Sequence, residues 1–423
     1  MKTTKFITLV ITVFVCFSCT DEYIDLGSGK QLSQEKNSRN YSEALRVAQK
    51  SISLLTPIMT RSGSSSREID LSKTRAITRP ASRNGSVEND TLIYVFNFKD
   101  NNGFALVSAS SATEELLAVT EKGNYDPDQP SEIEGFNRYI EQAVNYVSTV
   151  SSDGLRKPHP NENDEFKDSV VITYVPTPIQ HEPPYIPINW GQDTPEGDFC
   201  SNHIAGCVNT AIGEIMMFFS YPTSIQLTYP NADKSSEVLN WYNINHHIPG
   251  HEFSFCNDYI THNSIARLVR QIGYLTNSIY SYYETATLKD EIKPVLQALG
   301  FTVYNWANYN RLTVKTELSN GHLFMVSGRS YLKGHAWVLD HMIEKITTTY
   351  QLQLTANGWV PTGVVHTNTS NLLHYNWGEY GLCNGYFSEG VYDMSQAEIS
   401  DNVEGTNNGP TFSFDTQFVC VYH

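Results

Sequence analysis

A polar stretch near the middle of the chain most constrains how the chain can fold. Residues 151–169 read SSDGLRKPHPNENDEFKDS, with two prolines, many charges and one large aliphatic side chain. Because such a segment has little to bury, we expect it to be an exposed linker. It divides the 423 residues, enough for two or three domains, into a small unit at 41–150 and a larger domain at 170–423.

The unit at 41–150 carries signals for both helix and strand. Residues 41–56 place apolar side chains on one helical face. Residues 91–109 alternate as two strands around a turn at 99–103, which is typical of a hairpin. Ser131 and Glu134 then have the spacing of a capping box before a second helix. The apolar faces are Leu45, Val47, Ala48, Ile52 and Leu55 in the first helix, and Ile133, Phe136, Ile140, Val144 and Val147 in the second.

Residues 61–88 interrupt this unit with a stretch rich in Ser, Arg and Thr and poor in large apolar residues. Burial of such side chains cannot offset the entropy lost on ordering them. We therefore predict a flexible, exposed loop here, which is a target for proteases.

The N-terminus predicts export and a lipid anchor. Lys2 and Lys5 precede an apolar run, and Ser18-Cys19 then leads into polar residues. This order is typical of a signal peptide at 1–18, and a small residue before a cysteine resembles a bacterial lipobox. Cys19 would be acylated and followed by a linker at 19–40, which places the protein at the cell envelope, on the outer membrane or cell surface. A transmembrane anchor is the alternative, but the run is shorter than the ~20 residues that span a bilayer.

Composition and net charge narrow the classes of protein and of binding partner that remain. Apolar residues make up 40% and charged residues 17%, the balance of a folded protein. The net charge is −16, and removal of the two signal-peptide lysines makes it more negative. Nucleic acid is therefore not an expected partner, since phosphate binding requires a basic face.

The cysteines outside the signal and lipid site are odd in number: Cys200, Cys207, Cys256, Cys383 and Cys420. In an oxidising compartment at least one thiol must stay free or pair with another chain, so a reactive thiol is worth seeking. Cys200, His203 and Cys207 could be read as metal ligands, but a fourth ligand at regular spacing is missing. We expect no metal and no cofactor.

Cys207 stands at the start of a predicted helix. In GCVNTAIGEIM and beyond, apolar residues fall at 208, 211, 212, 215, 216 and 219, which is one helical stripe. A cysteine in the first helical turn faces free N–H groups and the positive end of the dipole, so a thiolate is favoured. Gly206 would let a substrate backbone approach. The alternative is a cysteine buried as a small apolar residue.

A proton partner for this thiol lies far along the chain. His335 occurs in GHAWVLD among strand-forming residues, and a cysteine and a histidine distant in sequence can meet in a fold. Asn376, in HYNWGE, offers a side-chain oxygen that could hold the imidazole in one tautomer. Trp377 would cover that hydrogen bond.

These motifs together resemble the streptopain family of papain-like cysteine peptidases. That family has G-C-V-[AN]-T-A-x-x-[QE]-I-M, G-H-A-[FW]-V-[IL]-D and N-W-G followed by a glycine-rich stretch. The resemblance implies an α+β fold, with a papain-like domain of a helical part and an antiparallel sheet part. It also implies that Gln192, in WGQDTP, donates to the oxyanion beside the Cys207 N–H. Residues 91–128 resemble the family's inhibitory prosegment.

Some positions depart from the family pattern. Glu196-Gly197 replace an aromatic residue and Asn after Pro195, and Glu379-Tyr380 replace a common second Trp. Residues 321–324 replace a G-x-P-V stretch near the family's substrate groove, and residues 61–88 and 226–256 look like insertions. The cleavage preference is therefore harder to transfer than the catalytic residues.

The sequence thus predicts the exported zymogen of a cysteine endopeptidase, with protein substrates and its own prosegment as intramolecular inhibitor. Arg156-Lys157 and Lys167 are candidate processing sites in the linker. Two alternatives stay open: another papain-like amidase, such as a cell-wall peptide hydrolase or a transglutaminase-like enzyme, and an inactive surface lipoprotein that binds a partner.

Overall fold

The structure is a computed structural model that describes residues 38–55, 67–79, 91–129, 131–152, 169–174, 179–180, 189–247, 258–329, 334–355, 358–392 and 416–423. All of them belong to one compact unit, Asn37–His423. The expected signal peptide, Cys19 and nearly all of the linker at 19–40 lie outside the described residues. So do Cys256 and most of the segments 61–88 and 151–169.

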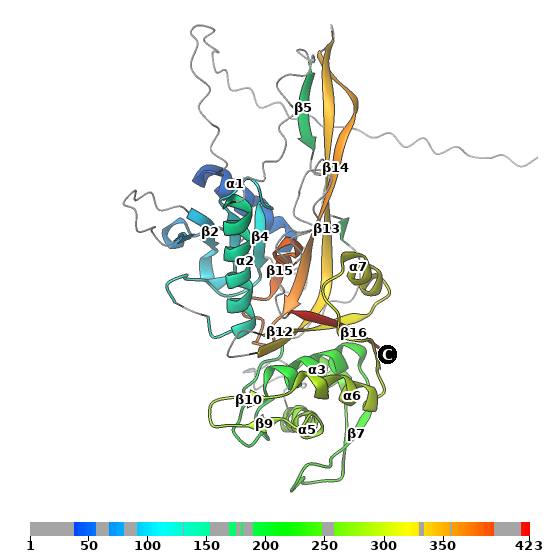
Figure 1. Ribbon diagram of the computed structural model, residues 1–423. Coiled ribbons are helices and arrows are strands. Elements are labelled where there is room, and N and C mark those ends of the chain that lie inside the picture. Colours follow the sequence, from blue (N-terminus) through cyan, green and yellow to red (C-terminus); the bar gives the residue numbers. More distant parts are fainter. Residues whose placement is uncertain are drawn as a thin grey trace, which may run out of the picture. The chain divides into compact units, whose positions relative to one another are not determined.

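The helices and strands come in runs along the chain, with β1–β4 and β12–β16 each consecutive, which is an α+β arrangement (Figure 1). The helices are α1 (Tyr41–Ser51), α2 (Glu134–Ser152), α3 (Cys207–Phe219), α4 (Trp241–Asn245), α5 (Tyr259–Leu275), α6 (Lys289–Ala298) and α7 (Arg311–Ser319). The N-terminal strands are β1 (Arg75–Thr78), β2 (Thr91–Asn97), β3 (Phe104–Ser108) and β4 (Leu116–Thr120). The later strands are β5 (Ser169–Tyr174), β6 (Ile179–Gln180), β7 (Ser224–Gln226), β8 (Ser236–Val238), β9 (Ile279–Tyr280), β10 (Thr285–Ala286), β11 (Thr302–Val303), β12 (Leu323–Arg329), β13 (Gly334–Thr355), β14 (Gly358–Asn376), β15 (Gly385–Ser388) and β16 (Gln417–Tyr422).

The N-terminal unit is a small sheet between two helices, as its sequence predicts. β2 and β3 form the expected hairpin, and β4 continues it. Asn40 caps α1 through a capping box with Glu43, and Ala44 and Ala48 pack on one face of the sheet. The apolar residues of α2 pack on the other face, beside β2 and β4 in Figure 1. The predicted apolar stripe of α2 is confirmed, since Ile133, Phe136, Ile140 and Val147 are buried.

The start of α2 differs from the expected capping box. The Ser131 hydroxyl accepts from the Ile133 N–H, and Asn137 closes the turn through its side-chain bonds to the Ser131 backbone. A side chain one turn into the helix thus takes the part that Glu134 was expected to play.

The loop predicted at 61–88 is partly ordered, which corrects the sequence expectation. Residues 75–78 form β1, which pairs with the outer edge of β2. Arg67 anchors the segment before it by donating to the carbonyls of Asn102 and Glu121. An edge strand is held by backbone hydrogen bonds, so it does not require the apolar side chains whose absence suggested disorder.

The two parts of the chain share one antiparallel sheet. Its order is β1-β2-β3-β4-β15-β14-β13-β12-β16-β11, so β4 of the N-terminal unit pairs directly with β15. In this pairing Val119 lies opposite Tyr386, and Ala118 lies opposite Phe387. The sequence predicted two units separated by a linker and gave no sign that their strands join.

The C-terminal part of the sheet is covered on both faces. Alternate residues of β12, β13 and β16 point toward α3, α5 and α6, among them Met325, Val338 and Val419. The residues between them, including Trp337 and Phe418, point to the face that α2 covers. The segment 226–256, expected as an insertion, contributes Leu227, Leu239 and Trp241 among its described residues to the core on the α3 face.

Candidate active site

Cys207 is the first residue of α3, where the sequence places it. Gly206 before it has a φ of +88°, and a Cβ there would lie 2.9 Å from the Thr285 side chain, so glycine is required. The predicted apolar stripe anchors the helix, since Val208, Ala211, Ile212, Ile215 and Met216 are buried. The thiol lies beside the backbone of Ala336, the residue that follows His335 on β13.

The Cys207 thiol is not activated in this structure, contrary to the expectation of a favoured thiolate. Burial raises the pKa of Cys207 to about 11, and the nearby Glu379 carboxylate acts in the same direction. Backbone donors at Ala336 and Val208 lower the pKa, but by less. Desolvation of the charged form outweighs the helix N-terminus here.

His335 points to the face of the sheet opposite α3. Its Nε2 lies 3.1 Å from the carbonyl oxygen of Trp377, and since a carbonyl can only accept, Nε2 carries the proton. Burial lowers the pKa of His335, which keeps the imidazole neutral. Both His335 and Cys207 lie in described residues, and no hydrogen bond joins them.

A glycine of the N-terminal unit lies directly against this histidine. Gly135, in the first turn of α2, is so close that an added Cβ would be 2.5 Å from His335 Cδ2 and 2.8 Å from the Trp377 ring. The His335 ring is also nearly parallel to Trp337, with the ring centroids 6.1 Å apart. The imidazole is therefore packed between α2 and two indoles.

The side chains of Gln192 and Glu379 bond to each other near His335. The Gln192 side-chain N–H donates to the Glu379 carboxylate. Burial raises the pKa of Glu379, while the Gln192 bond and His335 act against that rise. The amide expected to serve an oxyanion is thus engaged with the residue that departs from the family pattern.

Asn376 comes just before Trp377, whose carbonyl bonds to His335, but the side chain of Asn376 bonds to other residues. Its amide donates to Glu214 at 2.9 Å, and its oxygen accepts from Gly378 N–H and the Asn384 amide at 3.1 and 3.0 Å. Glu214 is buried on α3, where desolvation raises its pKa well above the ordinary range. Sequence reasoning missed Glu214, although an acidic residue among the apolar residues of α3 was a usable signal.

Trp377 is fully buried and contacts His335 through its backbone carbonyl as well as its ring. Its indole N–H donates to the carbonyl of Cys383 at 2.9 Å. It shields the histidine from water, although it covers no Asn376–His335 bond in this structure. Of the site residues predicted from sequence, only Cys19 lies outside the described residues.

The described residues give no support to the alternative interpretation of Cys200, His203 and Cys207 as metal ligands. Cys200 is a buried free thiol whose sulfur lies 3.9 Å from the Glu196 carbonyl and the Tyr280 hydroxyl. These three residues do not bring their donor atoms together.

The helical part packs against an antiparallel sheet, Cys207 opens a helix, and His335 lies on the adjacent strand. This is the arrangement expected of a papain-like cysteine peptidase, and here the N-terminal unit packs against the histidine. Residues 187–387 match the family model described as Peptidase C10 family, and residues 30–146 match the one described as Spi protease inhibitor. The chain thus contains a region, residues 187–387, that is similar to the peptidase C10, or streptopain, family of cysteine-type peptidases, preceded by a region similar to the Spi protease inhibitor.

Two related proteins are similar to this chain. The thiol protease/hemagglutinin PrtT of Porphyromonas gingivalis is 23% identical over 70% of this chain, and the match spans about a third (34%) of that protein. A prointerpain A fragment of Prevotella intermedia is 19% identical, with a TM-score of 0.49, over 84% of this chain and 98% of the fragment.

Proposed function

We propose that the mature enzyme is an endopeptidase that cleaves protein substrates by acyl transfer through Cys207 and His335. The observation that carries this proposal is the position of the two residues. The Cys207 thiol lies beside Ala336, while the imidazole of the preceding residue is packed against Gly135 of the N-terminal unit.

In the proposed reaction the Cys207 sulfur attacks a peptide carbonyl and forms a tetrahedral intermediate. The Cys207 backbone N–H and the Gln192 amide hold its oxyanion. His335 first takes the proton of the Cys207 thiol and then gives it to the leaving amine, which departs as the thioester forms, and water hydrolyses that thioester. Trp377 shields the imidazole from water, and Asn376 orients it once the Asn376 side chain has left its present partners.

The proposal assigns latency to the N-terminal unit, which would act as the prosegment at 41–150. In the precursor His335 bonds to Trp377, Gln192 bonds to Glu379 and the Cys207 thiol is neutral. We propose that cleavage in the linker at 151–169, at Arg156-Lys157 or Lys167, releases α2. The His335 ring can then turn toward the sulfur of Cys207 in the catalytic domain at 170–423.

Replacement of Cys207 tests the nucleophile assignment. Cys207→Ala is expected to lower proteolysis of casein by several orders of magnitude, because catalytic residues act as a unit. It should also leave the precursor uncut if activation is autocatalytic. Cys200→Ala, at a second free thiol, which is buried, is the control and should retain activity. Proteolysis by purified Cys207→Ala protein would refute the assignment.

We further propose that the protein is exported and held at the bacterial envelope by an acylated Cys19. Support comes from residues 1–22 alone, which lie outside the described residues. Within the described part of the chain, no helix has both the length and the apolar character needed to cross a membrane. Mass spectrometry of the mature N-terminal peptide tests this proposal, which an unmodified Cys19 would contradict.

A further inference from the structure

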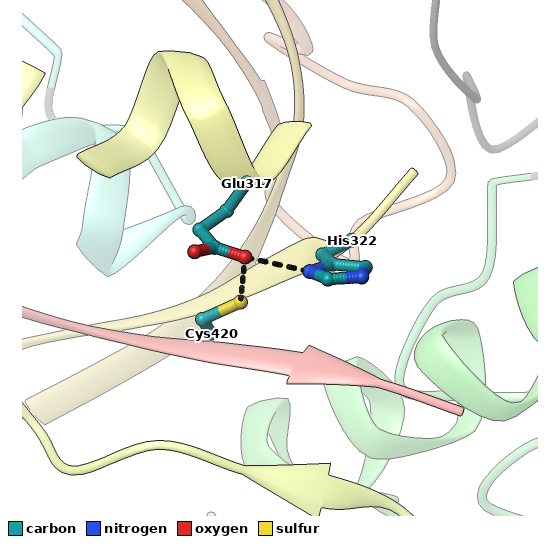
Figure 2. Close-up of side chains that lie close together, drawn as sticks. All are labelled: Glu317, His322 and Cys420. Carbon is teal, nitrogen blue, oxygen red and sulfur yellow. Dashed lines mark hydrogen bonds and ion pairs between the residues drawn. The ribbon is translucent and has the colours of Figure 1, made fainter. Parts of the chain in front are cut away.

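Three side chains that the proposed peptidase site does not use meet at the C-terminal strand. Glu317 comes from the last turn of α7, His322 follows that helix, and Cys420 lies on β16 (Figure 2). One donor atom from each lies within 4.8 Å of the other two. His322 Nδ1 is 2.7 Å from Glu317 Oε2, and Cys420 Sγ is 3.8 Å from the same oxygen.

The surrounding structure holds these donors in place. The His322 N–H bonds to the Glu317 carbonyl at 3.0 Å, which closes the turn between α7 and β12. Tyr422 stacks on the His322 imidazole with ring centroids 4.1 Å apart and planes 12° apart. Cys420 is buried, while the side chains of His322 and Glu317 remain 21% and 15% exposed. The cluster is therefore ordered, with one side open to water.

The charges around the cluster favour a cation. The Glu317 carboxylate lies at the C-terminal end of α7, where the helix dipole is negative, and the last turn of this helix has no basic residue.

We propose that Glu317, His322 and Cys420 bind one zinc ion, with water as the fourth ligand. Thiolate, imidazole and carboxylate are the donors that zinc takes, whereas calcium and magnesium prefer oxygen alone. In a tetrahedral zinc site the nitrogen and oxygen donors are about 3.3 Å apart and the sulfur and oxygen donors about 3.5 Å. The Nδ1–Oε2 and Sγ–Oε2 distances of 2.7 and 3.8 Å lie within about 0.6 Å of these values. The Cys420 proton leaves to solvent on binding.

Such an ion would cross-link β16 to the α7–β12 turn. β16 pairs with β12, whose Gly328 lies opposite His335 on β13. The bound ion would fix the C-terminal strand of the sheet that carries the histidine. This inference concerns stability and does not rest on the proposed peptidase mechanism.

Cobalt(II) and zinc(II) binding to the full-length Cys207→Ala precursor, without a histidine tag, tests the proposal. Removal of Cys207 eliminates a competing thiol. Cobalt(II) is expected to give a near-ultraviolet sulfur-to-metal charge-transfer band that saturates at one equivalent, and zinc(II) should abolish it. Excess zinc should raise the Tm by a few degrees, because it binds only the folded state.

Single variants locate the site. Cys420→Ser should remove the charge-transfer band. His322→Gln should weaken zinc binding by at least about tenfold, because loss of a residue that only hydrogen-bonds to a metal ligand already lowers metal affinity by that factor. Cys383→Ser, at another buried free thiol, is the matched control and should keep the band. Circular dichroism in EDTA verifies that each variant is folded. A missing band, or a band and zinc affinity that survive both substitutions, would overturn the proposal.

Discussion

At the scale of single residues, the precursor holds each proposed catalytic group in an unproductive contact. Glu379 is central to this, because it accepts from Gln192 and its charge acts on both Cys207 and His335. A carboxylate near a buried thiol disfavours the thiolate. In the proposed mechanism, latency would therefore have an electrostatic component in addition to the position of His335.

The reactivity of Cys207 is the first measurable consequence. With a pKa of about 11, on the order of one thiol in several thousand is ionised at pH 7.5, so the precursor should alkylate slowly and faster as pH rises toward 11. After the N-terminal unit is removed, we expect rapid alkylation at neutral pH. Intact-mass spectrometry with iodoacetamide separates the two species, and Cys207→Ser is the blank. Equal rates at neutral pH would contradict this account.

The motifs around Cys207, His335 and Asn376 named the candidate residues, because the proposed chemistry needs those residue types. The contacts of these residues were not predictable from the motifs. The partners of those side chains depend on Gly135, which packs on His335 from a distant part of the sequence. Nothing in the local pattern indicates which residue will lie against an imidazole.

At the scale of elements, α2 is the part of the precursor that touches the histidine. A side chain at Gly135 must displace His335, Trp377 or the helix, and overpacking of this kind costs about 1–3 kcal/mol. Gly135→Val should therefore raise the activity of the uncleaved precursor, or its rate of processing, by about tenfold. Hydrolysis of a fluorogenic peptide and the time course of cleavage measure the effect.

Asn145→Val is the matched control for that variant. It places the same β-branched residue on an exposed position of the same helix. Neither substitution lowers helix propensity, because valine ranks above glycine and close to asparagine, so only a change specific to position 135 reports the contact with His335. A precursor with Gly135→Val that stays as latent as the control would refute the role of this contact.

The periodic spacing of apolar residues predicted the helices and strands that bury one face. The helix from Cys207, the helix after Ile133 and the hairpin at 91–109 all follow from the spacing of apolar residues. β1 was missed because backbone pairing holds it, and the β4–β15 junction was missed because strand pairing between distant segments leaves no local signal.

At the scale of the whole molecule, a buried charge cluster joins the N-terminal unit to the peptidase domain. His374 Nδ1 lies 2.6 Å from Asp340, and its Nε2 lies 3.3 Å from Glu121, which follows β4. Burial alone would lower the pKa of His374, but the two carboxylates raise it to about 10.

This cluster makes precursor stability depend on pH. Because the folded pKa of His374 lies above its ordinary value of 6.5, its contribution is complete below about pH 6.5 and is lost as pH rises through about 10. Between pH 7 and 10 the unfolding free energy of the Cys207→Ala precursor should fall by on the order of a few kcal/mol. Urea unfolding at each pH measures the decrease.

Glu121→Gln should flatten that decrease, because it removes one of the charges that raise the pKa of His374. Glu115→Gln is the control: Glu115 pairs with Lys345 across the same two parts of the molecule. The Lys345 ammonium holds the pKa of Glu115 low despite burial, so Glu115→Gln changes the pH dependence of stability only in acid and should leave the slope between pH 7 and 10 unchanged. An unchanged slope for Glu121→Gln would exclude the cluster as the source.

The shared sheet has one more consequence, for solubility. β4 covers the edge of β15, and Tyr386 and Phe387 are fully buried in the precursor. Release of the N-terminal unit exposes the N–H and C=O groups of that strand, and open edges are templates for aggregation. The edge is only as long as Gly385–Ser388, and short edge strands limit this hazard. Maturation of this enzyme thus creates a self-association risk that the precursor does not have.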